Sequence, residues 1–306
     1  MDVLFLGTGA GMPSRQRNVT SIALKLLAER NEVWLFDCGE GTQHQILSIS
    51  LKPRKVKKIF ITHLHGDHIY GLPGFISSRA FLGGEDLWIY GPKGIKEYVL
   101  TSLKISQTYL KHELHFYEFL EDGKIFEDDT FMVELKKLDH GIDSYGFRVI
   151  EKDRPGELLV DQLKQVGVKP GPIYKEIKAG KDIVLEDGTT ILAKNFVGEA
   201  KKGKIVTILG DTRFCQAAID LAQNSDLLIH EATFAKGEEE LAFAYYHSTT
   251  LQAATVAKES NVKRLLVTHI SSRYDLKDIK MIVNQLREVV ENSDVAFDFY
   301  EEQIGV

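Results

Sequence analysis

Short apolar runs recur along the chain and end in glycine or in polar residues. They occupy residues 3–6, 33–36, 59–62, 87–90, 205–209, 227–229 and 265–267. Short runs rich in β-branched and aromatic side chains are typical of buried strands. Between several of these runs the apolar residues recur at helical spacing, as in residues 249–260 and 279–290, and Ser248 is predicted to cap the first of these helices. Strands mixed with helices throughout predict an α/β protein with helices packed outside sheets.

One segment departs from this pattern. Residues 151–201 are rich in charge, glycine and proline, and their apolar periodicity is weaker. Within them, residues 164–181 hold five lysines against Glu176, a local net charge of +4 (5 − 1), and include the turn Lys169-Pro170-Gly171-Pro172. Taken by itself, this segment predicts a solvated surface insertion in a single domain that spans residues 1–306.

Composition limits the class of protein more than its function. The chain has 306 residues, of which 43% are hydrophobic and 27% charged, as in a globular protein with a sizeable core. Residues 1–7 are predicted to form a strand rather than a signal peptide, and no run reaches the roughly 18 apolar residues of a membrane helix. Two cysteines, Cys38 and Cys215, favour a reduced cytoplasmic setting. The net charge of −6 argues against non-specific coating of nucleic acid but does not exclude a nuclease.

The most informative motif is His63-Leu64-His65-Gly66-Asp67-His68, directly after the apolar run 59–62. In an extended segment, side chains two residues apart point to the same side, so His63 and His65 can bind one ion. A turn at Gly66 would direct Asp67 and His68 towards a second ion. Imidazole and carboxylate suit zinc, and a site with an open position for water is catalytic. The motif therefore predicts a catalytic metal site.

Three further candidate ligands follow predicted strands. They are His140, Asp211 and His269. With the cluster they make five histidines and two aspartates, enough for two ions, and the carboxylate of Asp211 can bridge them.

Two other histidines lie in polar contexts. His230 precedes Glu231 after the run 227–229, and His247 precedes a predicted helix. A histidine beside a carboxylate can act as a general acid, but a capping or core hydrogen bond explains such residues equally well. His44, His112 and His115 lie in less informative surroundings, and we expect no role for them.

Together these residues resemble the ligand pattern of the metallo-β-lactamase superfamily, and four motifs resemble its ribonuclease Z family. The four motifs are the loop Pro13-Ser14-Arg15-Gln16-Arg17-Asn18, the turn Asp37-Cys38-Gly39-Glu40-Gly41-Thr42, and the late motifs His230-Glu231-Ala232-Thr233 and His247-Ser248-Thr249. The resemblance runs from Met1 to about Phe299. It implies an α/β fold of the αβ/βα sandwich type, with a protruding, flexible tRNA-binding arm at residues 151–201.

The resemblance also implies a function. The expected enzyme is a zinc-dependent endoribonuclease that removes the 3′ trailer from precursor tRNA, leaving a 3′-hydroxyl on the tRNA and a 5′-phosphate on the trailer. A cytoplasmic homodimer with two zinc ions per subunit is expected. Residues expected to contact RNA are Lys164, Lys169, Pro170, Gly171, Pro172, Lys175 and Lys178 in the arm, and Arg15 and Arg17 in the first loop.

The resemblance assigns each site residue a role. One ion is expected on His63, His65 and His140, and the other on Asp67, His68 and His269, with Asp211 between them. Asp67 is the expected proton acceptor. His247, steadied by Glu231, is expected to stabilise charge on the phosphate or to protonate the leaving group.

Two alternatives remain open on the sequence. The first is another hydrolase on the same scaffold, such as a small-molecule phosphodiesterase, thioesterase or lactonase, because a fold does not fix a substrate. The second is a non-catalytic RNA-binding protein with a relic metal site. A relic site would be expected to have lost ligands, whereas every expected ligand position in this sequence is filled.

Overall fold

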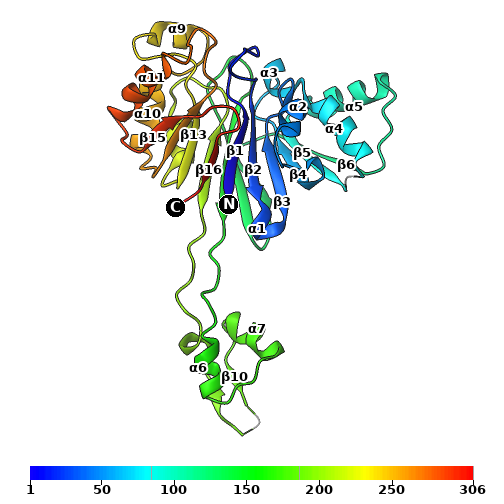
Figure 1. Ribbon diagram of the computed structural model, residues 1–306, viewed down its shortest axis with the longest axis vertical. Coiled ribbons are helices and arrows are strands. Elements are labelled where there is room, and N and C mark those ends of the chain that lie inside the picture. The colour runs from blue at the N-terminus through cyan, green and yellow to red at the C-terminus, as the bar shows by residue number, and fades with distance from the viewer. Residues whose placement is uncertain (84, 186, 306) are drawn as a thin grey trace. The chain divides into compact units, whose positions relative to one another are not determined.

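The chain folds into two compact units. The computed structural model describes residues 1–83, 85–185 and 187–305. The first unit comprises residues 1–127, 133–149 and 205–306, and the second comprises residues 128–132 and 150–204. All the residues predicted to bind metal or to act in catalysis belong to the first unit, and Figure 1 labels many of its helices and strands.

Two seven-stranded sheets form the first unit's centre. In spatial order the first sheet consists of β16 (Glu301–Gln303), β1 (Asp2–Gly7), β2 (Ser21–Leu26), β3 (Glu32–Phe36), β4 (Val56–Phe60), β5 (Leu87–Pro92) and β6 (Leu114–Phe119). The second consists of β15 (Ser293–Val295), β14 (Leu265–Thr268), β13 (Leu227–Glu231), β12 (Ile205–Leu209), β9 (Tyr145–Glu151), β8 (Phe131–Lys137) and β7 (Gly123–Glu127). The predicted strands therefore exist, with bounds that differ by up to three residues.

Both sheets contain a parallel half. In the first sheet β3, β4, β5 and β6 run parallel, and in the second β12, β13, β14 and β15 do. Parallel neighbours need a crossover connection, usually a helix. The carboxyl ends of such strands lie at one edge of their sheet, where ligand-binding residues of α/β proteins commonly gather.

The two sheets pack face to face through aromatic side chains. Phe36 and Phe60 stack with ring centroids 5.0 Å apart on the first sheet, and Phe147 on β9 of the second lies 5.5 Å from Phe60. Side chains alternate across a strand, so the intervening residues Leu35 and Ile59 face the other way, into the core beneath the outer helices. Both faces of the strands are apolar, which explains why the sequence shows short continuous runs rather than alternation.

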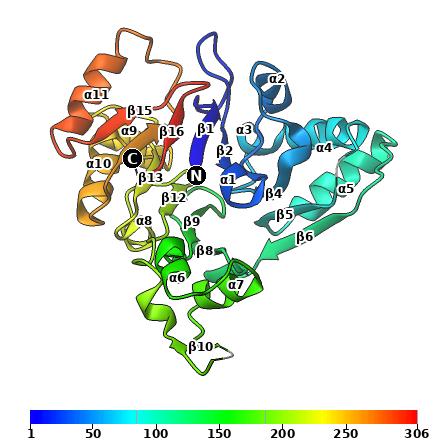
Figure 2. The ribbon, with the colours of Figure 1, turned by 60° about the horizontal axis from the view of Figure 1, so that its bottom comes forward.

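Helices cover the outer face of each sheet. The helices beside the first sheet are α2 (Thr42–Leu47), α3 (Gly66–Ile69), α4 (Leu72–Phe81) and α5 (Ile95–Ile105). Those beside the second are α8 (Gln216–Ala222), α10 (Thr250–Glu259) and α11 (Ile279–Arg287), on the opposite side of the unit in Figure 2. Short connections contain α1 (Leu27–Arg30), the 3-10 turn η1 (Pro53–Lys55) and α9 (Glu239–Ala244). The layers confirm the predicted αβ/βα sandwich.

The predicted cap of α10 is wrong by one residue. Thr249, not Ser248, is the N-cap: its side chain accepts from the backbone N–H of Gln252, and Gln252 reaches back to the Thr249 N–H in a capping box. Ser248 instead donates its hydroxyl to the carbonyl oxygen of Thr212 at 2.6 Å. Ser248 therefore ties two site loops together rather than starting the helix.

The second unit has a small core of its own. It contains α6 (Val160–Gln165), α7 (Pro172–Lys178), the two-stranded ribbon of β10 (Ile183–Val184) and β11 (Thr190–Ile191), and the turn η2 (Ala193–Asn195). Its fully buried side chains are Leu163, Val168, Ile177, Ile191 and Ala193. The sequence pattern hid this core because five buried residues spread over 31 positions leave little periodicity. The predicted insertion, residues 151–201, falls within this unit.

We predict that Phe60→Ala destabilises the first unit by about 3–5 kcal/mol, because it removes a buried ring from the layer between the sheets. Urea unfolding followed by tryptophan fluorescence measures this, since the buried Trp34 lies 5.7 Å from Phe60. Phe81→Ala is the matched control: Phe81 is 89% exposed, so its loss should change the free energy of unfolding by less than about 0.5 kcal/mol. Equal effects of the two changes would contradict the assignment of Phe60 to the core.

Candidate metal centre

The predicted ligands lie at the carboxyl ends of strands from both sheets. The loop after β4 and the start of α3 carry His63, His65, Asp67 and His68, while His140 follows β8, Asp211 follows β12 and His269 follows β14. Three segments of the chain that are far apart in sequence thus converge with the 63–68 loop. The structure brings all seven predicted ligands together.

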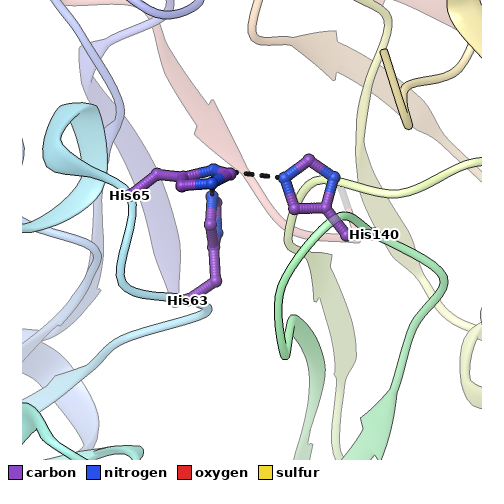
Figure 3. A group of neighbouring side chains, drawn as sticks. All are labelled: His63, His65 and His140. Carbon is purple, nitrogen blue, oxygen red and sulfur yellow. Dashed lines mark hydrogen bonds between the residues drawn. The ribbon is translucent and has the colours of Figure 1, made fainter. Parts of the chain in front are cut away.

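Three histidines form one candidate ligand group. His63 Nε2 lies 3.1 Å from His65 Nδ1, and His65 Nδ1 lies 3.2 Å from His140 Nε2. Figure 3 shows the three rings pointing towards one another, His63 and His65 from the same loop and His140 from the facing one. The three nitrogens all lie within 4.8 Å of one another, close enough to bind one ion.

A second candidate group contains Asp67, His68 and His269. Asp67 Oδ2 lies 3.5 Å from His68 Nε2 and 3.3 Å from His269 Nε2. Asp211 connects this group with the first one, because its Oδ2 lies 3.3 Å from His269 Nε2 and 3.7 Å from His63 Nε2. Asp211 therefore occupies the position that a bridging carboxylate requires.

Hydrogen bonds orient the imidazoles of the 63–68 loop. His68 donates from Nδ1 to Asp37 Oδ2 at 2.7 Å, which turns Nε2 towards the ligand group. His63 Nδ1 lies 2.9 Å from Thr62 Oγ1, which in turn donates to Asp37 Oδ2 at 2.8 Å. Acceptors of this kind fix the tautomer of a metal-binding histidine. Asp37 thus positions two candidate ligands without being one.

His140 and His269 are held in the same way. His140 Nδ1 lies 2.8 Å from the carbonyl oxygen of Tyr246 and donates to it, and His269 Nδ1 donates to Thr233 Oγ1 at 2.9 Å. Thr233 in turn donates to Glu231. In these four rings the nitrogen bonded to the orienting partner is Nδ1, which leaves Nε2 on the side of the ligand groups.

The backbone around the site adopts conformations that few residues accept. Asp37, Tyr246 and His269 all have φ near +60°, a left-handed conformation that is uncommon outside glycine. Such strain concentrates at functional sites, where the surrounding structure enforces it. Gly39 adds a close approach, because a Cβ there would lie 2.2 Å from the carbonyl oxygen of Asp67. Only glycine at this position lets the metal loop sit against the Asp37 turn.

The charges at the site suit cation binding. Burial raises the pKa of Asp211, but the neighbouring His269, His68 and His63 outweigh burial and hold that pKa well below its ordinary value. Burial likewise raises the pKa of Asp67, but the neighbouring His269 and His68 lower it further than burial raises it. Both carboxylates are ionised. Burial and the charge of His68 lower the pKa of His63, which leaves that ring neutral as a metal ligand must be.

One atom tests whether a metal fits. His68 Nε2 is buried without a hydrogen-bond partner, although it lies 3.5 Å from oxygens of both Asp67 and Asp211. Burial would lower the pKa of His68, but Asp211 and Asp37 raise it well above its ordinary value. The carboxylates thus favour a positive charge at the place towards which His68 Nε2 points. A metal cation supplies both the charge and the missing partner, so the residues fit a metal centre.

Glu231 and His247 form a buried pair beside the ligands. Glu231 Oε1 accepts from His247 Nδ1 at 2.9 Å and from the Ser248 N–H at 3.0 Å. Burial lowers the pKa of His247, but the charges of Glu231 and Asp211 outweigh burial and raise it to about 9. The imidazolium of His247 therefore persists at neutral pH, with its second nitrogen available for a proton transfer.

Three other residues have clear structural surroundings. His230 is fully buried and its Nδ1 lies 2.7 Å from the carbonyl oxygen of Glu231, which indicates a core role. Arg17 is buried too, and it donates to the Thr8 hydroxyl and the Ala296 carbonyl oxygen. Because these hydrogen bonds hold the Arg17 side chain inside the protein, we no longer expect it to contact RNA. Arg15, by contrast, is exposed.

Four residues that orient the ligands were missed or left without a role on the sequence. They are Asp37, Thr62, Thr233 and Tyr246. Asp37 and Thr233 lie inside motifs that carry the family resemblance, which is the signal that could have found them. Tyr246 contributes a backbone carbonyl, which leaves no mark in a sequence.

The region of the chain that the structure describes contains no helix that is both long and apolar enough to span a bilayer. Both cysteines, Cys38 and Cys215, are free thiols.

The chain resembles known proteins along nearly its whole length. A family model described as "Anti-Pycsar protein Apyc1" matches residues 1–153, which include the 63–68 loop but none of the ligands from Asp211 onward. Ribonuclease Z of Latilactobacillus sakei subsp. sakei (strain 23K) is 59% identical over 299 residues, covering 97% of this chain and 96% of that protein. Ribonuclease Z of Geobacillus kaustophilus (strain HTA426) is 56% identical over 300 residues, covering 98% and 97%.

Solved structures agree with these sequence similarities. Human tRNase Z, short form, has a TM-score of 0.72 and 30% sequence identity, and the match covers 100% of both chains. The metallo-β-lactamase fold protein YhfI from Bacillus subtilis has a TM-score of 0.68 at 17% identity, covering 98% of both chains, which supports the fold alone. The predicted fold is confirmed, and by its similarity to these relatives the chain belongs to the ribonuclease Z family.

Proposed function

We propose that the chain is a metal-dependent endoribonuclease that removes the 3′ trailer from precursor tRNA. The observation that carries this proposal is the joining of two ligand groups by Asp211 next to the Glu231–His247 pair. Phosphodiester hydrolysis needs an activated water, neutralisation of charge and a proton for the leaving oxygen, and this arrangement offers a group for each. Membership of the ribonuclease Z family supports RNA as the substrate, and human tRNase Z supports tRNA.

The proposed cofactor is zinc, with two ions per subunit. His63, His65 and His140 would hold one ion, Asp67, His68 and His269 the other, and Asp211 would bridge them. Mixed imidazole and carboxylate ligands suit zinc. When bound, such a pair of cations supplies a water of lowered pKa and Lewis acidity towards the phosphate.

Asp67 is the proposed proton acceptor. Its ionised carboxylate accepts the Gly11 N–H at 2.8 Å through Oδ2, which fixes the side chain next to His269. The ionised carboxylate can accept a hydrogen bond from the attacking water and take its proton as the bond to phosphorus forms. The water oxygen then bonds to phosphorus.

His247 is the proposed proton donor to the leaving oxygen. As the bond between phosphorus and the 3′ oxygen breaks, the imidazolium transfers a proton to that oxygen and the tRNA leaves with a 3′-hydroxyl. The phosphate remains on the 5′ oxygen of the trailer. Glu231 holds the ring by its Nδ1 and keeps it charged until the transfer.

The second unit is the proposed tRNA-binding arm. Lys164, Lys169, Lys175 and Lys178 are exposed on it, and Pro170, Gly171 and Pro172 form the turn into α7. Lysines bind the phosphate backbone by charge, independent of sequence. On the family resemblance we also propose that the protein acts as a homodimer in the cytoplasm, with one subunit's arm holding the tRNA that its partner cleaves.

Asp67→Asn should lower cleavage of a trailer-bearing precursor tRNA by at least about 100-fold, since a general base contributes roughly 10²- to 10⁴-fold. Binding of the tRNA should remain close to that of the unchanged protein. Single-turnover cleavage with mapping of the cut site, together with a filter-binding assay, measures both. Asp143→Asn removes the same charge three residues from His140, at a side chain that is 62% exposed, and should leave cleavage unchanged. Retained turnover in Asp67→Asn would remove this residue from its role.

Asp37→Ala should lower the affinity for zinc by about 10- to 100-fold, because partners that orient metal ligands typically contribute that much. Competition with a chromophoric chelator measures the affinity directly, without any assay of cleavage. Asp187→Ala, on the second unit's surface, is the control. An unchanged affinity in Asp37→Ala would mean that His68 keeps its orientation without the Asp37 hydrogen bond.

Replacing Lys169, Lys175 and Lys178 together by alanine should weaken tRNA binding and flatten its dependence on salt. Each lost phosphate contact lowers the slope of log K against log salt by about 0.9. The change in slope is tested by measuring tRNA binding between roughly 50 and 200 mM salt, a range over which phosphate contacts have a large effect on affinity. The control replaces Lys93, Lys96 and Lys104, which are exposed on the first unit around α5. Equal salt dependence in both triple variants would contradict the assignment of the arm.

A further inference from the structure

A pocket opens directly beside the proposed proton acceptor. It has a volume of about 410 Å³ and its lining includes Asp67 and His65 of the metal centre, Met12, Glu40 and Tyr70. All of these residues belong to the first unit. The metal centre does not require Met12, Glu40 or Tyr70, so the mechanism leaves this part of the site without a role.

Tyr70 forms one wall and is built into the metal loop. It ends α3, with its backbone N–H bonded to the Gly66 carbonyl oxygen at 2.8 Å. Its ring lies against Gly66, where a Cβ would be only 2.2 Å from Tyr70 Cε2. Gly66 begins α3 without a left-handed backbone, so its role is to leave room for this ring beside Asp67.

The Tyr70 ring still presents surface to solvent. The residue is 65% exposed. Met12, also lining the pocket, is 62% exposed. A flat aromatic ring and a flexible thioether are surfaces that accept planar apolar ligands of varied outline.

The charge of the pocket lining decides whether the pocket suits a phosphate or a nucleobase of an RNA. Its lining, all of it within the described residues, includes the carboxylates Glu40 and Asp67 and neither lysine nor arginine. Carboxylates repel a phosphate, whereas a nucleobase is neutral, planar and carries N–H donors that a carboxylate accepts. Unpaired bases in protein–RNA complexes commonly stack on exposed aromatic side chains.

We propose that this pocket receives one unpaired nucleobase of the RNA, from a nucleotide adjoining the cleaved phosphate, stacked on Tyr70. The proposal rests on the proposed ribonuclease function and adds a specificity-determining contact to it. Because Asp67 lies in α3 and Tyr70 caps the end of this short helix, a stacked base fixes the position of the neighbouring phosphate relative to the proton acceptor. Cleavage thus depends on an unpaired nucleotide at one particular place.

Stacking can be read directly with a fluorescent base. Precursor tRNA transcripts carrying 2-aminopurine on either side of the cleavage site are mixed with the zinc-loaded enzyme in a stopped-flow instrument, and fluorescence is followed before cleavage. The expected result is quenching at one of the two positions. Quenching should persist in Tyr70→Phe, which keeps the ring, and disappear in Tyr70→Ala and in Tyr70→Leu, which keeps apolar bulk over Gly66 without an aromatic face.

Steady-state kinetics give a second readout. In Tyr70→Ala and Tyr70→Leu the KM for precursor tRNA should rise by about 5- to 100-fold, the range that loss of one base–aromatic stack produces. Tyr70→Phe should restore it. Tyr109→Ala removes a tyrosine that is 79% exposed elsewhere on the first unit and should match the unchanged protein. Zinc content, measured on each variant, should stay the same.

The proposal is overturned if quenching persists in both Tyr70→Ala and Tyr70→Leu, or if their KM equals that of the unchanged enzyme. A rise in KM that Tyr70→Phe does not reverse would also overturn it, because the ring and not the hydroxyl is the proposed contact. Failure of the proposed function has a different signature, in which the unchanged enzyme leaves the trailer intact. Quenching of a single-stranded oligonucleotide carrying 2-aminopurine would then still show whether the pocket binds an unpaired base.

Discussion

A buried imidazole nitrogen with no hydrogen-bond partner is the constraint on which the candidate site depends. His68 Nε2 lies between the carboxylates of Asp67 and Asp211, while Asp37 holds the other side of the ring. Leaving a polar atom unpaired inside a protein costs about 1–3 kcal/mol. A cation removes this cost and neutralises the carboxylates at the same time. The close approach at Gly39 and the left-handed backbone of Asp37 are further costs that the fold accepts to hold this geometry.

The sequence predicts the ligands better than it predicts what orients them. His63, Asp211 and His269 follow apolar strands, and in a sandwich with parallel strands such positions meet at one edge. The orienting bonds join residues that no local pattern relates: 31 positions separate His68 from Asp37, and 106 separate His140 from Tyr246. Where the acceptor is a backbone carbonyl, any residue type can provide it. The zinc ions, the homodimer and the roles of single residues stay predictions.

The strand pattern predicted the fold because central strands such as β3, β13 and β14 are buried on both faces. The errors of the sequence analysis have local causes. Ser248 and Thr249 are equally good caps by type, and the tertiary bond from Ser248 to Thr212 decides between them. The basic loop around Arg17 predicts an RNA-binding cation. In the structure, however, the buried guanidinium of Arg17 donates hydrogen bonds to the Thr8 hydroxyl and the Ala296 carbonyl oxygen. Burial lowers the pKa of Arg17, although the nearby Asp298 raises it. A sequence shows which residues carry charge, but only packing shows which charges remain available.

An acidic chain can still act on a polyanion if its charges are divided among separate tasks. The net charge is −6, but residues 164–181 of the second unit carry exposed lysines, which we propose to bind the tRNA backbone. At the candidate metal centre the carboxylates suit cations, which in the proposed reaction would neutralise the phosphate that is cut. Glu40 and Asp67 keep other phosphates out of the adjoining pocket and leave it to a neutral base beside Tyr70. Negative charge close to the reaction therefore favours one register of the RNA, because only the phosphate that reaches the cations escapes the repulsion.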